Sequence, residues 1–375
     1  MQLIDRDGRL TPVLKILTDY PRDDLAHDEV HQSLVTACVT RGLYPANIDV
    51  GSIASLDTIV AGFKTAQLVF NSKLGYGHIF HTNCAPRKNI VSVKSAGEKI
   101  VLGMTASGVV LLAVNAGYTL APFHDAVKAG EMVFFQTSVP DSGSQFRSRD
   151  YFPDAMADLT LHLATRFASM GEEKIRQTLK ARGYRELLEG LSYLGEPMNI
   201  SSFPQLPEGT IYYIDNFGNM KLNMKHAKIV AQHKPGTPLV AAIGNTVCDV
   251  VVGDVGFSMG EGVVAITSGS SGWAIGGGEK EMFAEIFLRG GRADSHFPGA
   301  KTGDQLLAMT RADLERVIET LKGASGDVSG RHDLYNISEA RIMHMLARAR
   351  LLNGFDSSEL QKAFAANDLE KRLMA

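Results

Sequence analysis

The chain has 375 residues, of which 45% are hydrophobic and 21% charged, and its 38 Lys and Arg residues against 41 Asp and Glu residues give a net charge of -3. This composition is typical of a globular protein and excludes an intrinsically disordered chain. A balance so close to neutral provides no global basic field, so neither nucleic acid nor an anionic membrane is an expected partner. Three cysteines stand far apart without a CxxC pair: Cys38, Cys84 and Cys248. This spacing excludes a disulfide scaffold and a thiolate zinc site, and it fits a reducing compartment.

The sequence contains no apolar run close to the roughly 18 residues that a membrane-spanning helix needs. Its longest apolar runs, such as 109–114 and 263–267, are short, and residues 1–7 carry no apolar signal region. We therefore expect a cytoplasmic protein.

The first half of the chain alternates apolar runs that predict strands with periodic patterns that predict helices. Residues 13–17 predict a buried strand with Thr18 and Asp19 at its tip, and acidic residues then open a helical pattern that continues to Cys38. Further helices are expected over 55–70 and 154–168, and further strands over 77–82, 90–93, 100–102 and 109–114. We therefore predict an α/β N-terminal domain over residues 1–190.

The second half has a different pattern. Prolines and glycines between 188 and 210 predict a linker. Strand-like runs separated by turns then follow at 210–214, 239–243, 247–252 and 263–266. These runs predict an all-β, barrel-like C-terminal domain over residues 191–302. After residue 303 the pattern becomes helical, including 306–309, 312–321, 338–352 and 359–373, which predicts a helical extension over 303–375.

Several short motifs carry little weight by themselves. His27 and His31 have the i, i+4 spacing of helical metal ligands, but a solvated acidic helix start explains them better, and no metal is expected. The glycines at 276–278 lack the GxxxxGK[ST] pattern of a phosphate loop. Residues 269–272 are one residue too short for the GxSxG nucleophile elbow. Turn glycines account for both stretches.

Polar clusters at predicted strand ends are more informative. They occur at 18–19, 83–88, 146–150, 215–219 and 270–272. In open α/β sheets, ligands bind outside the carboxyl ends of the strands. One such cluster is usually a turn or a cap, but several of them, divided between two predicted domains, predict a binding cleft.

Four segments carry a family resemblance. They are ILTDY at 16–20, FRSRDYF at 146–152, IDNFGNM at 214–220 and GSSGWAI at 269–275. They resemble, in this order and spacing, the LTDFG, FHGRDIF, IDxFGN and NSSG segments of the S-adenosylmethionine hydroxide adenosyltransferases. That superfamily also contains the fluorinating and chlorinating enzymes that act on S-adenosylmethionine. The resemblance covers residues 12–290, and FxxRD followed by IDxFGN is its most specific part.

The resemblance implies an α/β domain followed by a β-barrel-like domain, in a homotrimer with ligand sites at subunit interfaces. S-adenosylmethionine would be the substrate, and no further cofactor is implied. Asp19 would hold the ribose hydroxyls and Asn219 would face adenine, roles that suit a carboxylate and an amide. Asp215 and Ser270 would bind the amino and carboxylate ends of methionine. Ser271, also assigned to the substrate site, stands where the halogenating relatives carry Arg.

The chain departs from the family at the Asp-Arg-His triad that is thought to activate water in the hydrolases. Asn83 stands at the Asp position, Arg147 stands at the His position, and either Arg87 or Lys88 stands for the family Arg. Asn does not titrate and Arg stays protonated, so both changes remove a general base. Ser148 matches the serine that the fluorinating relatives carry at the halide site. We therefore assign Asn83, Arg87, Arg147 and Ser148 to the catalytic region.

These changes leave three hypotheses open. The first is an enzyme that cleaves S-adenosylmethionine at C5′, releasing methionine by in-line displacement with water or with an anion such as halide. The second is a non-catalytic protein that binds S-adenosylmethionine or a nucleoside and has a degenerate triad. The third is an interaction protein that uses the amphipathic segment 341–352, although packing of that helix on its own trimer is the simpler explanation.

Overall fold

The computed structural model describes residues 11–86, 98–138, 146–244, 246–275 and 278–315. The chain divides into two compact units. Unit 1 comprises residues 1–206 and 273–280, and unit 2 comprises residues 207–272 and 281–375. The predicted strand at 90–93 and most of the predicted helical extension lie outside the described residues.

Unit 1 is built on a seven-stranded mixed sheet with the order β2-β1-β3-β5-β4-β6-β7. Its strands are β1 (Val13–Thr18), β2 (Asn47–Ser52), β3 (His78–Asn83), β4 (Ile100–Thr105), β5 (Val110–Val114), β6 (Met132–Thr137) and β7 (Leu194–Pro197). The strands β1, β2, β3 and β5 are parallel, and β4 is antiparallel to β5 and β6. The buried strands β4 and β5 are apolar runs, as expected for a sheet covered on both faces.

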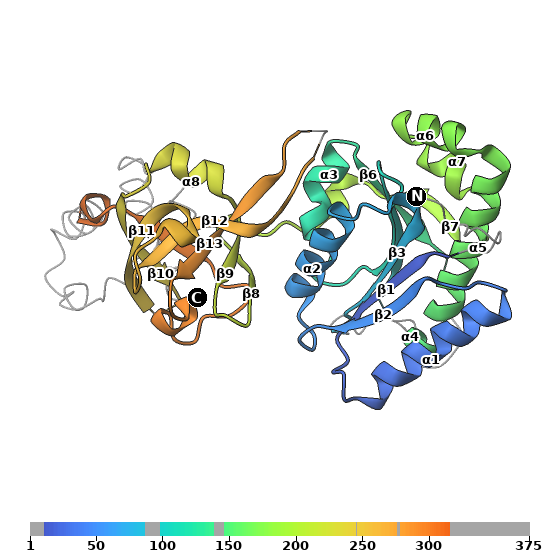
Figure 1. The fold of residues 1–375 in the computed structure, drawn as a ribbon, viewed down its shortest axis with the longest axis horizontal. Coiled ribbons are helices and arrows are strands. Elements are labelled where there is room, and N and C mark those ends of the chain that lie inside the picture. Colours follow the sequence, from blue (N-terminus) through green and yellow to red (C-terminus); the bar gives the residue numbers. More distant parts are fainter. Residues whose placement is uncertain (1–10, 87–97, 139–145, 245, 276–277, 316–375) are drawn as a thin grey trace, which may run out of the picture. The chain divides into compact units, whose positions relative to one another are not determined.

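Helices cover both faces of this sheet (Figure 1). The helices α2 (Thr58–Phe70) and α3 (His124–Lys128) lie on one face, and α1 (Leu25–Thr40), α4 (Arg147–Asp150) and α5 (Phe152–Met170) pack together on the other. Two of these helices begin at acidic caps: Asp24 accepts a hydrogen bond from the Ala26 N–H, and Asp57 accepts from two N–H groups of α2. The structure thus confirms the α/β pattern predicted for this half.

Several elements of unit 1 were not predicted, namely the strands β2 and β6, two helices that follow α5, and an edge strand. The helices α6 (Glu172–Lys180) and α7 (Tyr184–Leu188) follow α5, and β7 pairs with β6 inside the stretch predicted to be a linker. That prediction was wrong for residues 194–197, because an edge strand tolerates Gly and Pro that a central strand does not.

Unit 2 is a curled, seven-stranded half-barrel with the order β14-β10-β11-β12-β13-β9-β8. Its elements are β8 (Ile211–Ile214), β9 (Met220–Lys225), α8 (His226–Gln232), β10 (Pro238–Ile243), β11 (Thr246–Val255), β12 (Val264–Trp273), β13 (Glu281–Leu288) and β14 (Leu306–Met309). Ile211, Leu222, Ile266 and Ile286 contribute to its buried core. The predicted all-β, barrel-like architecture is confirmed.

The prediction of helix at 306–309 is wrong. Leu306–Met309 forms β14, which pairs antiparallel with β10 and closes one edge of the sheet. A four-residue apolar run does not distinguish a strand from a helical turn, and here pairing with a neighbouring strand decides. Within the described residues, no helix is long and apolar enough to cross a membrane.

Candidate functional site

The first group of candidate residues meets at the carboxyl edge of the unit 1 sheet. Thr18 at the end of β1 is in register with Ser52 at the end of β2 and with Asn83 at the end of β3. Asp19 continues from β1, and its backbone N–H donates to the carbonyl of Asn83 at 3.2 Å. Because these strands are parallel, three chain segments distant in sequence end side by side, as the polar strand ends predict.

A chain of side-chain hydrogen bonds links two candidate residues at this edge. The Asn83 amide donates to the Tyr20 hydroxyl at 3.3 Å, and the Tyr20 hydroxyl lies 3.0 Å from the Ser148 hydroxyl. Asn83 and Ser148 are each 5% exposed, so these bonds form away from bulk water. The structure therefore brings Asn83 and Ser148 together through Tyr20, which the sequence did not single out.

Tyr20 is held in place by an aromatic contact. Its ring packs edge-on against Phe146, with ring centroids 5.5 Å apart. Phe146 precedes α4, the short helix that carries Ser148, and the Arg149 guanidinium lies 4.9 Å from the centroid of its ring. Arg149 also forms ion pairs with Glu29 and Asp150. These contacts tie the tip of β1 to the start of α4.

Asp19 organises the loop that follows β2. One of its carboxylate oxygens accepts the Leu56 N–H at 3.2 Å, and its carbonyl accepts the Ser55 hydroxyl at 3.1 Å. Leu56 adopts a positive φ of 63°, a conformation that is costly for a branched residue. The Cys84 thiol also hydrogen-bonds to Asp19, and burial first, then this carboxylate, raises its pKa. Cys84 is therefore a protonated thiol, not a nucleophile.

Two buried hydroxyls at the same edge have no hydrogen-bond partner among the described residues. They are the hydroxyls of Thr18 and Ser52, which are in register with each other on neighbouring strands. Buried hydroxyls are normally satisfied, because leaving one without a partner costs about 1–3 kcal/mol. These two hydroxyls lie beside Asp19 and are available to a further hydrogen-bonding group.

A neutral histidine lies on β3 two residues before Asn83. The Nδ1 of His81 donates to the Leu112 carbonyl at 2.9 Å, and its ring packs 4.2 Å from that of Phe152. Burial lowers the pKa of His81 to about 4, so the imidazole is uncharged at neutral pH. Its Nε2 has no partner in the described part of the chain. His81 therefore adds no positive charge beneath the candidate site.

The two arginines proposed near the reacting carbon have different outcomes. Arg147 opens α4 and is half-buried, and its charge lowers the pKa of the neighbouring Tyr151 phenol, opposing the larger effect of burial. Arg87 lies outside the described residues. The catalytic role of each stays a prediction.

In unit 2, Asp215 holds the turn between β8 and β9. Its Oδ1 accepts the N–H groups of Phe217 and Asn219 at 2.9 and 3.0 Å, and its Oδ2 accepts the Asn219 amide at 3.2 Å. The Lys221 ammonium lies 3.4 Å from the same Oδ2. Asp215 and Asn219 are thus fixed against each other. The turn needs these two residue types, because their side chains make its hydrogen bonds.

A buried ion pair links this turn to the second candidate segment. Lys221 and Glu285 are cross-strand partners on β9 and β13, and their charged groups are in direct contact with little exposure to solvent. A Cβ at Gly269 would lie 3.1 Å from the Glu285 carboxylate, so the start of the GSSG segment packs directly against this pair. The sequence missed Lys221 and Glu285 because the two residues lie 64 positions apart.

The two serines of that segment differ in access. Ser270 is exposed, whereas Ser271 is buried. A Cβ at Gly272 would lie 2.3 Å from the Glu281 carbonyl, so only glycine allows β12 and β13 to approach this closely. Ser270 can therefore meet a ligand directly, while Ser271 points into the unit.

Two exposed phenylalanines near Asn219 also escaped sequence analysis. Phe217, within the Asp215 turn, is 75% exposed, and Phe257 is 85% exposed. Phe257 packs edge-on against Phe287, with ring centroids 6.2 Å apart. Phe287 follows Ile286, the cross-strand partner of Met220 at the start of β9. Exposed aromatic faces of this kind suit stacking on a planar ring.

One histidine of the pair on α1 is bound to a backbone carbonyl. His27 donates through Nε2 to the Val50 carbonyl at 3.1 Å. Among the residues that the structure describes, no three His, Cys, Asp or Glu side chains gather in a metal-binding group.

Comparisons with known proteins give the fold. No family model matches the sequence, and no curated protein matches it. An uncharacterized conserved protein from Thermotoga maritima superimposes with a TM-score of 0.53 at 13% identity, over 79% of this chain and 100% of that one. A conserved hypothetical protein from Thermus thermophilus superimposes with a TM-score of 0.45 at 15% identity, over 80% of this chain and 100% of that one. At these identities the first likeness shows a shared fold.

Proposed function

We propose that this chain is an enzyme that binds S-adenosylmethionine and cleaves it at C5′, releasing methionine. The observation that carries the proposal is the hydrogen-bonded chain of Asn83, Tyr20 and Ser148 beside Asp19 at the carboxyl edge of a parallel sheet. Three of these residues come from segments that resemble S-adenosylmethionine-cleaving enzymes.

Asp19 is proposed to bind the ribose of the substrate. A carboxylate has about four acceptor sites, so one group can hold the Leu56 N–H and a cis-diol at the same time. The unpartnered hydroxyls of Thr18 and Ser52 lie at the same edge and can complete the polar contacts of a sugar. This assignment explains why the edge contains hydroxyls that the described part of the protein does not satisfy.

Residues of unit 2 are proposed to bind the remaining parts of the substrate. Asn219 presents an amide to the adenine edge, with Phe217 and Phe257 as stacking surfaces for its ring. Asp215 and the exposed Ser270 are proposed to receive the amino and carboxylate groups of methionine. We propose that a homotrimer completes each site, with unit 1 of one copy facing unit 2 of a neighbouring copy.

The reaction proposed is an in-line displacement at a sulfonium centre. The nucleophile forms a bond to C5′ while the C5′–S bond breaks, and the electron pair of that bond stays with sulfur as the neutral thioether of methionine. An anionic nucleophile needs no proton transfer, whereas water must also lose a proton. Because Asn83 and Ser148 are hydrogen-bond groups and not bases, they suit orientation of an anion. We therefore propose an anion, halide included, ahead of water.

The proposal is tested by incubating the full chain with S-adenosylmethionine labelled in the adenosyl group. Parallel reactions contain no added anion, chloride, bromide, fluoride or azide, and chromatography separates adenosine from 5′-substituted adenosines. We expect a 5′-substituted product with at least one anion, and loss of that product in Ser148→Ala. Ser169→Ala, an exposed serine on α5, is the matched control and should keep full turnover. Adenosine formed equally in every reaction would contradict the role of an anion.

A second function is favoured by Asn83 itself. An amide at the position of the family carboxylate cannot act as a base, which is also the change expected in a protein that binds S-adenosylmethionine without cleaving it. Calorimetry separates the two functions: heat of binding without methionine release supports the binding protein, and absence of both binding and product contradicts each function.

The described cysteines are free, which supports the cytoplasm as the compartment for either of the two proposed functions.

A further inference from the structure

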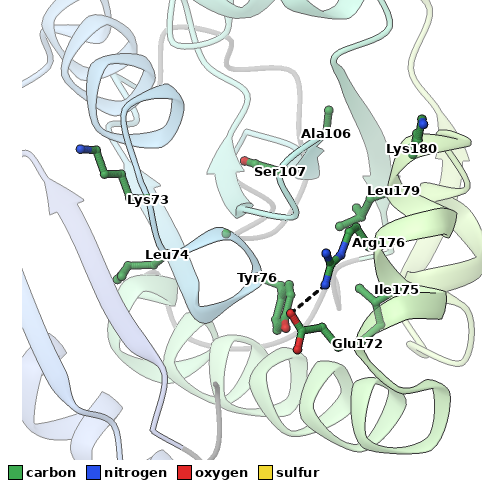
Figure 2. Close-up of a pocket in the computed structure, with 11 residues that line it drawn as sticks. Lys73, Leu74, Tyr76, Ala106, Ser107, Glu172, Ile175, Arg176, Leu179 and Lys180 are labelled. Carbon is green, nitrogen blue, oxygen red and sulfur yellow. Dashed lines mark hydrogen bonds and ion pairs between the residues drawn. The ribbon is translucent and has the colours of Figure 1, made fainter. Parts of the chain in front are cut away.

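Unit 1 contains a cavity of about 370 Å³ that the proposed function does not use. It lies between the loop after α2, the turn that joins β4 to β5, and helix α6 (Figure 2). Its residues Lys73 to Tyr76 precede β3, so the cavity is at the amino end of that strand, whereas Asn83 stands at the carboxyl end. A six-residue strand spans about 20 Å, which separates this cavity from the candidate site.

The floor of the cavity is apolar and tightly packed. Ile175 and Leu179 of α6 are buried, and the ring of Tyr76 packs edge-on against Phe167 with centroids 4.6 Å apart. Two turns approach each other closely at this point. Gly75 has a positive φ of 55°, and a Cβ there would lie 2.8 Å from the Ser107 carbonyl. The apolar floor is therefore a built surface and not a gap between loosely placed loops.

The rim of the cavity is positively charged. Lys73, Arg176 and Lys180 line it, against a single carboxylate, that of Glu172. Arg176 forms an ion pair with Glu172 at 3.0 Å, which is drawn in Figure 2, and a second one with Glu173 at 3.9 Å. Neither lysine forms an ion pair with any residue in the part of the chain that the structure describes. Within that part, two positive charges at the rim are thus left without compensation.

Hydroxyl groups lie between the apolar floor and this rim. Burial raises the pKa of the Tyr76 phenol, and the nearby Glu172 raises it further, so the phenol is a proton donor at neutral pH. The Ser107 hydroxyl lies 2.9 Å from that of Thr105 and lines the cavity from the β4–β5 turn. The arrangement combines an apolar floor, hydroxyl donors and an excess of cations, in a volume typical of small-molecule sites.

We propose that this cavity binds a small organic phosphate monoester. The phosphate would lie at the rim beside Lys180, on the side of the cavity formed by α6, where Arg176 can exchange its exposed pairs with Glu172 and Glu173 for a phosphate oxygen. The organic group would lie on the floor of Tyr76, Ile175 and Leu179. This is a second site, independent of S-adenosylmethionine cleavage, on the opposite edge of the same sheet.

Calorimetry on the full chain tests the proposal with phenyl phosphate as the probe. Inorganic phosphate tests the charged group alone, benzyl alcohol tests the apolar group alone, and benzoate replaces phosphate by a carboxylate. We expect phenyl phosphate to bind more tightly than all three, with an affinity that falls as salt is added. Lys180→Gln should weaken binding about fivefold. Lys174→Gln, on the same helix but outside the cavity, is the matched control and should leave the affinity unchanged.

Four results would overturn the proposal. The first is the absence of binding heat with about 10 mM phenyl phosphate in about 50 mM salt, where screening is weak. The second and third are an affinity for phenyl phosphate no higher than that for inorganic phosphate, or no higher than that for benzoate. The fourth is equal weakening of phenyl phosphate binding by the two lysine variants. Because the readout is heat from a probe without a sulfonium, failure here leaves the cleavage of S-adenosylmethionine as it stands. Failure of that cleavage likewise leaves the binding of phenyl phosphate unaffected.

Discussion

Replacing Tyr20 by Phe removes one hydroxyl from the hydrogen-bonded chain and leaves its ring contact with Phe146 intact. The variant deletes two hydrogen bonds, one to Ser148 at 3.0 Å and one from Asn83 at 3.3 Å. Since each such bond contributes about 1 kcal/mol, we expect the free energy of unfolding to fall by about 2 kcal/mol. In the proposed enzyme, turnover should also fall, because Ser148 loses its orienting partner.

A double-mutant cycle separates this interaction from other effects of the substitution. Urea denaturation of wild type, Tyr20→Phe, Ser148→Ala and the double variant should give a coupling energy of about 1 kcal/mol at unchanged m-value. Tyr118→Phe is the control, since that tyrosine is 40% exposed and lies outside the chain of hydrogen bonds. A coupling energy of zero, with Tyr20→Phe as stable as the control, would refute the hydrogen-bonded chain and with it the main support for the site.

Three further variants test other parts of the structure. Glu285→Gln leaves the Lys221 ammonium buried without its main counter-charge, so chemical denaturation should show that the free energy of unfolding falls by about 3–5 kcal/mol. The double variant Lys221→Met with Glu285→Leu should recover most of this stability. No recovery would contradict a purely electrostatic cost. The pKa of His81 is about 4 in the folded chain against 6.5 in the unfolded one. Only the unfolded chain takes up this proton as pH falls from 6.5 to 4, so stability should drop by up to about 3 kcal/mol across that window. His81→Phe should remove this part of the pH dependence, and an unchanged difference in urea midpoint between pH 7 and pH 4.5 would count against it. Gly272→Ala places a Cβ 2.3 Å from the Glu281 carbonyl, so the melting temperature should fall by several degrees. A variant with the melting temperature of the wild type would show that β12 and β13 can separate at this point.

The sequence predicts the parts of the fold that depend on local patterns. The apolar run at 13–17, the helical pattern ending at Cys38 and the helix at 154–168 appear as β1, α1 and α5 with ends shifted by a few residues. These elements have a continuous apolar run or apolar residues at helical spacing, and burial against the sheet reinforces the local preference. The predicted α/β unit and half-barrel unit follow from the same patterns.

The errors and omissions depend on pairing between distant segments. The run at 306–309 is too short to show its period, and it became a strand only because β10 offers an unpaired edge. The helix α6 was missed because most of its residues are charged or polar, although Ile175 and Leu179 have the i, i+4 spacing of a buried helix face.

The candidate site shows the same division. Asp19 and Ser148 were found because they lie in segments that resemble a family pattern, and Asn83 because it stands at the position of the family Asp. The pattern says nothing about which side chains touch. Tyr20 joins Asn83 to Ser148 across 63 and 128 residues of sequence, and only the folded chain shows it. Lys221 and Glu285 are missed for the same reason, since a buried charged pair is recognisable only once both members are placed.

The Lys221–Glu285 pair also determines how the half-barrel can assemble. Successive residues of a strand face opposite sides of the sheet, so a slip of β13 by one position would turn Glu285 away from Lys221. The largely buried ammonium would then keep only Asp215 as a nearby counter-charge, at a cost of several kcal/mol. The pair therefore favours the native register over a slipped one, and the native register is the one that places Gly269 against Glu285 and Ser270 at the surface.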